Sequence, residues 1–72
     1  MDNYNKYYPR LKDLREDKDL TQNELAKYLR TTQKQYSRWE TGENEISTHL
    51  LIELAKFYKT SIDYIVGLTN KK

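Results

Sequence analysis

Apolar residues recur along the chain at spacings of three and four, which is the pattern of amphipathic helices, and no stretch alternates like a strand. The first helix is expected over about residues 8–17, with Pro9 in its first turn, where proline is tolerated. Tyr7, Leu11 and Leu14 form its apolar stripe. Further helices are expected over about residues 21–30, 33–41, 48–58 and 62–66.

Two capping signals lie close together in the middle of the chain. Thr21 and Glu24 have the spacing of a capping box, in which the hydroxyl and the carboxylate each satisfy a free backbone amide. Thr32 and Gln35 repeat this spacing eleven residues later, and Gly42 can end the helix that follows in a left-handed conformation. The pattern therefore predicts two short helices, each with its own start.

The short connection between these two helices predicts how they pack. Only three or four residues separate them, so their axes are expected to cross steeply, as in a helix-turn-helix. Ser47 or Thr48 is expected to cap the fourth helix, Ser61 the fifth, and Gly67 ends the fifth. The fold class predicted is all-α: a five-helix bundle that contains a helix-turn-helix.

The composition excludes most catalytic chemistry. The chain has no cysteine, one histidine (His49) and two glycines, Gly42 and Gly67. No second histidine or any thiolate can join His49 in a metal site, and glycine-rich phosphate loops are missing. We therefore expect neither an enzyme nor a metal or other cofactor.

The chain offers no sign of a membrane segment. Its longest apolar run is three residues, Leu50 to Ile52, and its first ten residues lack the apolar stretch of a secretory signal. We expect a cytoplasmic protein with one domain over residues 8–68, between a flexible segment 1–7 and a flexible tail 69–72.

The distribution of charge is more informative than its sum. The net charge is +2, from 13 basic and 11 acidic side chains. Residues 27–38 contain four basic side chains and no acidic one, whereas charges balance from Glu43 onward. A local basic stretch of this kind fits a small nucleic-acid footprint, and it equally fits an ordinary solvated helix face.

Residues 10–68 resemble the repressor/Cro (XRE) helix-turn-helix family, which has the lambda-repressor-like fold. The resemblance rests on Thr21-Gln22-x-Glu24-Leu25-Ala26, Tyr36-Ser37-Arg38-Trp39-Glu40-x-Gly42, Leu54-Ala55 and Ser61-Ile62-Asp63-Tyr64. It implies a transcriptional regulator, with repression as the expected sense, that binds double-stranded DNA sequence-specifically. It also implies that the helix over about residues 33–41 enters the major groove.

The exposed positions of this third helix are the candidates for reading bases. Glutamine can bond adenine through two atoms, and lysine can donate to guanine. Gln35 is also the capping-box partner of Thr32, so Gln33 and Lys34 rank before it; Trp39 is expected in the core. The base-contacting candidates are Gln33, Lys34, Gln35, Ser37 and Arg38.

The resemblance also supplies phosphate and structural roles. In the family, a glutamine matching Gln22 holds a phosphate and braces the recognition helix. Arg15 and Glu40 match an ion pair that joins the first helix to the third, although two separate surface charges would fit the sequence as well. The phosphate-contacting candidates are Gln22, Arg30, Thr32 and Thr41.

The carboxyl-terminal part of the domain is where the family dimerises, so a homodimer on a two-fold symmetric operator is expected. Half-sites would then lie about 10–10.5 base pairs apart. Candidates for an exposed apolar patch, each with core packing as the alternative, are Ile46, Ile62, Tyr64, Ile65 and Leu68.

Three turns depart from the family pattern, in which glycine is frequent at the positions of Asp19, Arg30 and Lys59. Arginine and lysine would each cost about 1–2 kcal/mol in a left-handed conformation. These turns therefore have another shape, or the domain carries strain.

A protein-interaction module or antitoxin on the same scaffold is the alternative function. A protein-binding third helix would usually offer apolar or aromatic anchors. The hydrogen-bonding set at positions 33–38 favours DNA instead.

Overall fold

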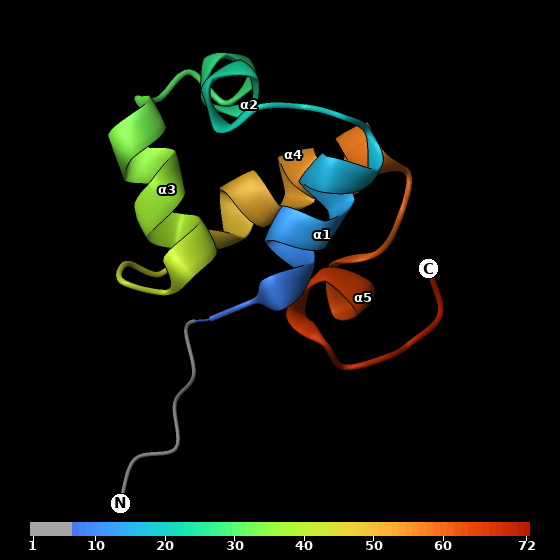
Figure 1. Cartoon of the computed structure of the whole chain (residues 1–72). Coiled ribbons are helices and arrows are strands. Elements are labelled where there is room, and N and C mark those ends of the chain that lie inside the picture. Colours follow the sequence, from blue (N-terminus) through green and yellow to red (C-terminus); the bar gives the residue numbers. More distant parts are fainter. Residues whose placement is uncertain (1–6) are drawn as a thin grey trace, which may run out of the picture.

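The computed structural model describes residues 7–72, and this part of the chain is all-helical (Figure 1). Within it, α2 and α3 pack directly on each other, and α1 contacts both α3 and α5. The predicted fold class is confirmed, and the predicted bounds of the third and fifth helices agree with the structure. The helices are α1 (Pro9–Asp17), α2 (Gln22–Tyr28), α3 (Gln33–Thr41), α4 (Thr48–Tyr58) and α5 (Ile62–Val66).

Side-chain caps start four of these helices. The capping box of α2 is complete, because the Glu24 amide donates to Thr21 Oγ1 (3.1 Å) and the Thr21 amide donates to Glu24 Oε1 (2.8 Å). At α3 only half of the box forms: the Gln35 amide donates to Thr32 Oγ1 (3.1 Å), and within residues 7–72 the Gln35 side chain makes no bond back. Ser47 and Ser61 cap α4 and α5.

The core gathers leucines from three helices, α1, α2 and α4, around the aromatic side of α3. Tyr36 is fully buried and Trp39 nearly so, and their rings meet edge to face with centroids 6.3 Å apart. The inward placement predicted for both residues is confirmed. Burying one side of α3 in this way leaves its opposite side at the surface.

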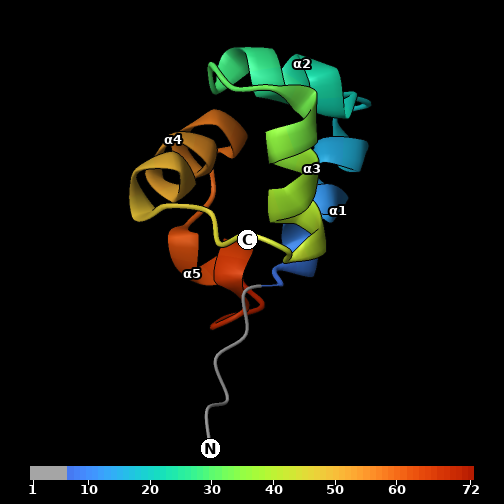
Figure 2. The ribbon, with the colours of Figure 1, turned by 90° about the vertical axis from the view of Figure 1, so that its left-hand side faces the viewer.

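The helix-turn-helix has the steep crossing that its short turn requires. In Figure 1 α2 is seen end-on above the upright α3, and the turned view in Figure 2 shows α2 lying across the top of α3. The turn runs from the carboxyl end of α2, through Arg30, to the Thr32 cap. It fixes the direction in which α3 leaves α2.

The carboxyl-terminal residues lie against α1. The Arg10 guanidinium donates to the carbonyls of Tyr64 (2.8 Å) and Thr69 and to Asn70 Oδ1 (2.6 Å), and it stacks 4.1 Å from the centre of the Tyr64 ring. Two residues of the tail that was predicted to be flexible, Thr69 and Asn70, take part in these contacts. The flexibility of residues 69–72 itself stays a prediction. The predicted flexible segment 1–7 lies outside the described residues, except for Tyr7.

The three turns that lack glycine do adopt the left-handed conformation. Asp19, Arg30 and Lys59 have φ angles of 57°, 61° and 57°. Aspartate tolerates this region, whereas a long unbranched side chain at such a φ carries a steric cost. The sequence left open whether these turns have another shape or carry strain, and the structure has the strained conformation.

Replacing Arg30 by glycine is expected to raise the melting temperature. Relief of about 1–2 kcal/mol of strain exceeds the entropy of about 0.5–1 kcal/mol that glycine adds to the unfolded chain. Thermal unfolding followed by circular dichroism measures the change. Lys59→Gly tests the same strain at a second turn, with a φ of 57°, and a clear fall in melting temperature for both variants would refute the strain.

Candidate nucleic-acid interface

The start of α2 and the outer side of α3 together border one open depression on the surface. Its lining includes the two glutamines at which these helices begin, and it contains no apolar side chain. The lining residues are Gln22, Gln33, Lys34, Ser37, Arg38 and Glu43. The structure thus brings four of the five base-contacting candidates together with one phosphate-contacting candidate.

Helical spacing explains why these side chains share a surface. Tyr36, Trp39 and Glu40 occupy the buried side of α3, so positions 34, 37 and 38 fall away from it, and Gln33 is exposed beside them as the first residue of the helix. Gln33 and Lys34 are exposed. Their amide and ammonium groups are therefore free to meet an incoming hydrogen-bonding partner.

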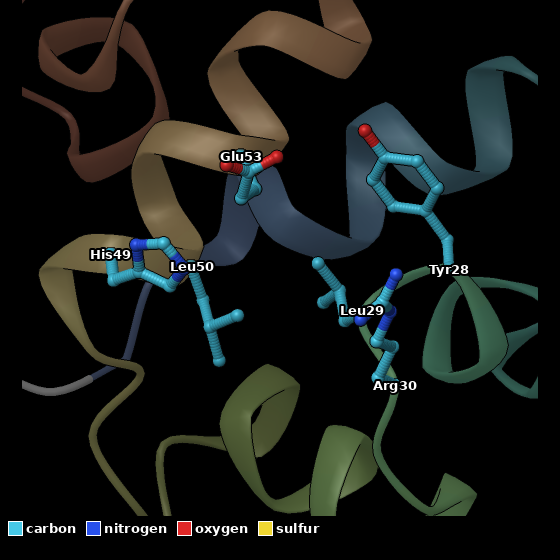
Figure 3. Close-up of a pocket in the computed structure, with 6 residues that line it drawn as sticks. All are labelled: Tyr28, Leu29, Arg30, His49, Leu50 and Glu53. Carbon is cyan, nitrogen blue, oxygen red and sulfur yellow. The ribbon is translucent and has the colours of Figure 1, made fainter.

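The remaining candidates lie elsewhere. Gln35 is partly buried beside the Thr32 cap, and neither residue lines the depression. Thr41 is at the far end of α3, where its hydroxyl donates to the Arg38 carbonyl (3.2 Å). Arg30 faces a different hollow, between α2 and α4 (Figure 3).

An acidic side chain borders the basic surface. Glu43 follows α3, and its carboxylate lies 3.7 Å from Arg38 Nε in an exposed pair. The stretch 27–38 lacks acids in sequence, but in space one acid faces it. No local sequence signal indicated this contact, because it depends on how the chain turns after Gly42.

A buried polar network holds α2 and α3 to α1. Arg15 Nε donates to Glu40 Oε2 (2.6 Å), Arg15 Nη2 donates to Glu40 Oε1 (3.3 Å), and Arg15 Nη1 donates to the Leu20 carbonyl (2.8 Å). Gln22 Nε2 adds a bond to Glu40 Oε1 (3.0 Å). Since Gln22 also borders the depression, this network orients the entry of α2 relative to α3.

The network explains the direction of two pKa shifts. Burial alone would raise the pKa of the Glu40 carboxyl, but the hydrogen bonds from Arg15 and Gln22 outweigh it and lower that pKa. The hydrogen bond to Glu40 likewise raises the pKa of Arg15. Burial raises the pKa of Tyr36, and the nearby Glu40 carboxylate adds to the effect. The pair is therefore ionised at neutral pH.

The predicted dimer patch is only partly at the surface. Ile46 and Ile65 are 2% and 1% exposed, which corrects their place in an exposed patch: both belong to the core, the alternative that the sequence left open. Ile62 and Tyr64 are partly buried, whereas Leu68 is 78% exposed. Leu68 is the candidate that a second copy could reach most readily.

Among residues 7–72, no helix is long and apolar enough to span a membrane. The same residues include no group of three or more potential metal ligands.

Comparison with known proteins adds an independent observation. The helix-turn-helix family matches residues 11–65. The chain is 34% identical over 64 residues, 89% of its length, to the uncharacterized HTH-type transcriptional regulator YobD of Bacillus subtilis. It is 35% identical over 63 residues (86%) to the uncharacterized regulator YqaE of the same species. It is 33% identical over 58 residues (81%) to the HTH-type transcriptional activator BcrR of Enterococcus faecalis.

These matches cover 57%, 54% and 28% of the relatives' own lengths, respectively. The chain therefore spans little more than half of YobD and YqaE, and less of BcrR. No solved structure matches it significantly.

Proposed function

The chain belongs to the helix-turn-helix family, and from that premise we propose that it is a sequence-specific, double-stranded-DNA-binding domain of a transcriptional regulator. The observation that carries the proposal is the open depression in which Gln22 of α2 meets the polar side of α3. Membership of this family also sets the chain apart from enzymes.

The proposed docking places α3 in the major groove. Gln33 and Lys34, both exposed in the first turn, would read base edges, with Ser37 and Arg38 one turn further along. Gln35 ranks last because it is partly buried and outside the depression.

A second group of side chains would hold the backbone of the duplex. Gln22 keeps its Oε1 free while its Nε2 bonds Glu40, and it stands at the amino-terminal end of α2, where phosphate is favoured. Thr32, Thr41 and Arg30 are the further phosphate candidates. Such contacts fix the orientation of the domain without reading sequence.

We further propose that two copies bind a two-fold symmetric operator, with Leu68 at their contact, and that the protein acts in the cytoplasm, where bacterial DNA lies. Repression is the proposed sense, since a dimer on an operator sterically blocks a promoter. BcrR is named an activator, so a reporter gene placed behind the selected operator decides between the two senses.

Binding selection from random duplexes tests the function. The full chain should enrich a motif made of two symmetric half-sites about 10–10.5 base pairs apart. Gln33→Ala and Lys34→Ala should each relax preference at particular positions and cost about 1–3 kcal/mol there. Lys12→Ala, an exposed lysine on α1, is the matched control and should leave the motif unchanged.

Each part of the proposal can fail separately. The absence of any enriched motif at low salt would refute sequence-specific binding. A single asymmetric half-site would refute the dimer and leave DNA binding in place.

A further inference from the structure

A second hollow lies between the end of α2 and the start of α4 (Figure 3). It shares no lining residue with the proposed DNA-binding depression. Its six lining residues are Tyr28, Leu29, Arg30, His49, Leu50 and Glu53.

The floor of this hollow is apolar and its rim is polar. Leu29 is 9% exposed and belongs to the core, and Leu50 packs partly against that core. Tyr28 closes one end, where its ring stacks on Phe57 with centroids 4.6 Å apart. The hollow thus offers an aliphatic surface beside hydrogen-bonding groups.

Opposite charges face the hollow without neutralising each other. Figure 3 shows the Arg30 guanidinium and the Glu53 carboxylate at the same opening, reached from different elements. Within residues 7–72 neither side chain forms an ion pair or a hydrogen bond. The same is true of the His49 ring and the Tyr28 hydroxyl. Four polar side chains at one hollow are therefore available to a ligand.

From this arrangement we propose that the hollow binds a small zwitterion, a free α-amino acid with an aliphatic side chain. The ligand carboxylate pairs with Arg30, on the α2 side of the hollow. The ligand ammonium pairs with Glu53. The aliphatic side chain covers Leu29 and Leu50.

The open shape of the site implies weak binding, with a Kd on the order of 1 mM. Ligand binding here does not depend on the proposed DNA-binding function. Its position does give it a consequence for that function, because Arg30 lies two residues before the Thr32 cap of α3. A bound amino acid links this turn to α4 and restrains the entry into the recognition helix.

The test uses L-leucine and two analogues that each lack one charge: 4-methylpentanoate, without the ammonium, and 3-methylbutylamine, without the carboxylate. Each is titrated into the full 72-residue chain, with amide chemical shifts as the readout. L-leucine should shift the amides of Leu29, Arg30 and Leu50 in a saturable way. Each analogue should bind about fivefold more weakly or worse, since it loses one ion pair.

Variants locate the two charge contacts. Arg30→Gln and Glu53→Gln should each weaken L-leucine binding about fivefold; Glu53→Gln keeps the length of the side chain, and Arg30→Gln shortens it. Lys12→Gln and Glu45→Gln remove the same charges away from the hollow and should leave L-leucine binding unchanged.

Three results would overturn the proposal. Equal affinity for all three compounds would show a purely apolar contact. Full affinity for 4-methylpentanoate would show an anion site, such as one for a DNA phosphate. No saturable shift at concentrations above about ten times the expected Kd would show that the hollow binds no amino acid.

Discussion

Replacing Arg15 by methionine is expected to lower the free energy of unfolding by about 3–5 kcal/mol, because it leaves a buried carboxylate without its cation. The Glu40 side chain is 3% exposed and would keep the bond from Gln22 but lose both of its bonds to the guanidinium. For a domain of this size the loss approaches the whole stability. Urea unfolding followed by circular dichroism measures it.

Two controls distinguish the effect of breaking the buried Arg15–Glu40 ion pair from the effect of losing any arginine side chain. Arg38→Met also removes an arginine from an ion pair, but that pair is exposed and 3.7 Å long, so the loss should stay within about 1 kcal/mol. The double variant Arg15→Met with Glu40→Leu removes both buried charges and should be more stable than Arg15→Met alone. Additive losses in the double variant would contradict the coupling.

The effect of Arg15→Met should depend on pH in a defined direction. In the native protein the Glu40 pKa lies below its ordinary value of 4.5, so its contribution is present above pH 4.5 and is lost as pH falls through the lowered pKa. In the variant the unpaired, buried carboxylate has a raised pKa instead. The two proteins should therefore converge in stability as the pH falls.

This pair also shows where sequence reasoning stops. Arg15 and Glu40 are 25 positions apart, so no helical spacing joins them, and only the family resemblance suggested their contact. Caps behave differently: Thr21, Thr32, Ser47 and Ser61 each bond an amide within the same turn. Because a cap is local, the sequence located the helices well.

In the candidate interface, too, some features follow from local sequence and others depend on contacts between distant residues. The exposed side of α3 follows from the burial of Tyr36 and Trp39, which periodicity predicts. The approach of Glu43 to Arg38, and the anchoring of residues 69–70 by Arg10, depend on the path of loops in space. Loop paths leave little periodic signal in a single sequence.

Gly42→Ala is expected to lower the free energy of unfolding by about 2–5 kcal/mol, from two separate causes. Gly42 ends α3 at a φ of 83°, where a side chain costs about 1–2 kcal/mol. An added Cβ would also lie 2.9 Å from Tyr7 Cβ and 3.0 Å from Tyr7 Cα, and overpacking of this kind costs about 1–3 kcal/mol. Chemical denaturation of both proteins measures the sum.

Gly67→Ala is the control that carries the backbone cost alone, without the contact with Tyr7. Gly67 ends α5 at a similar φ of 92°, but a Cβ there would meet nothing within 4 Å, so only the backbone cost of about 1–2 kcal/mol should appear. The difference between the two variants then measures the contact of Tyr7 with the end of α3. Equal losses would mean that Tyr7 moves away at no cost and does not hold the end of α3 in place.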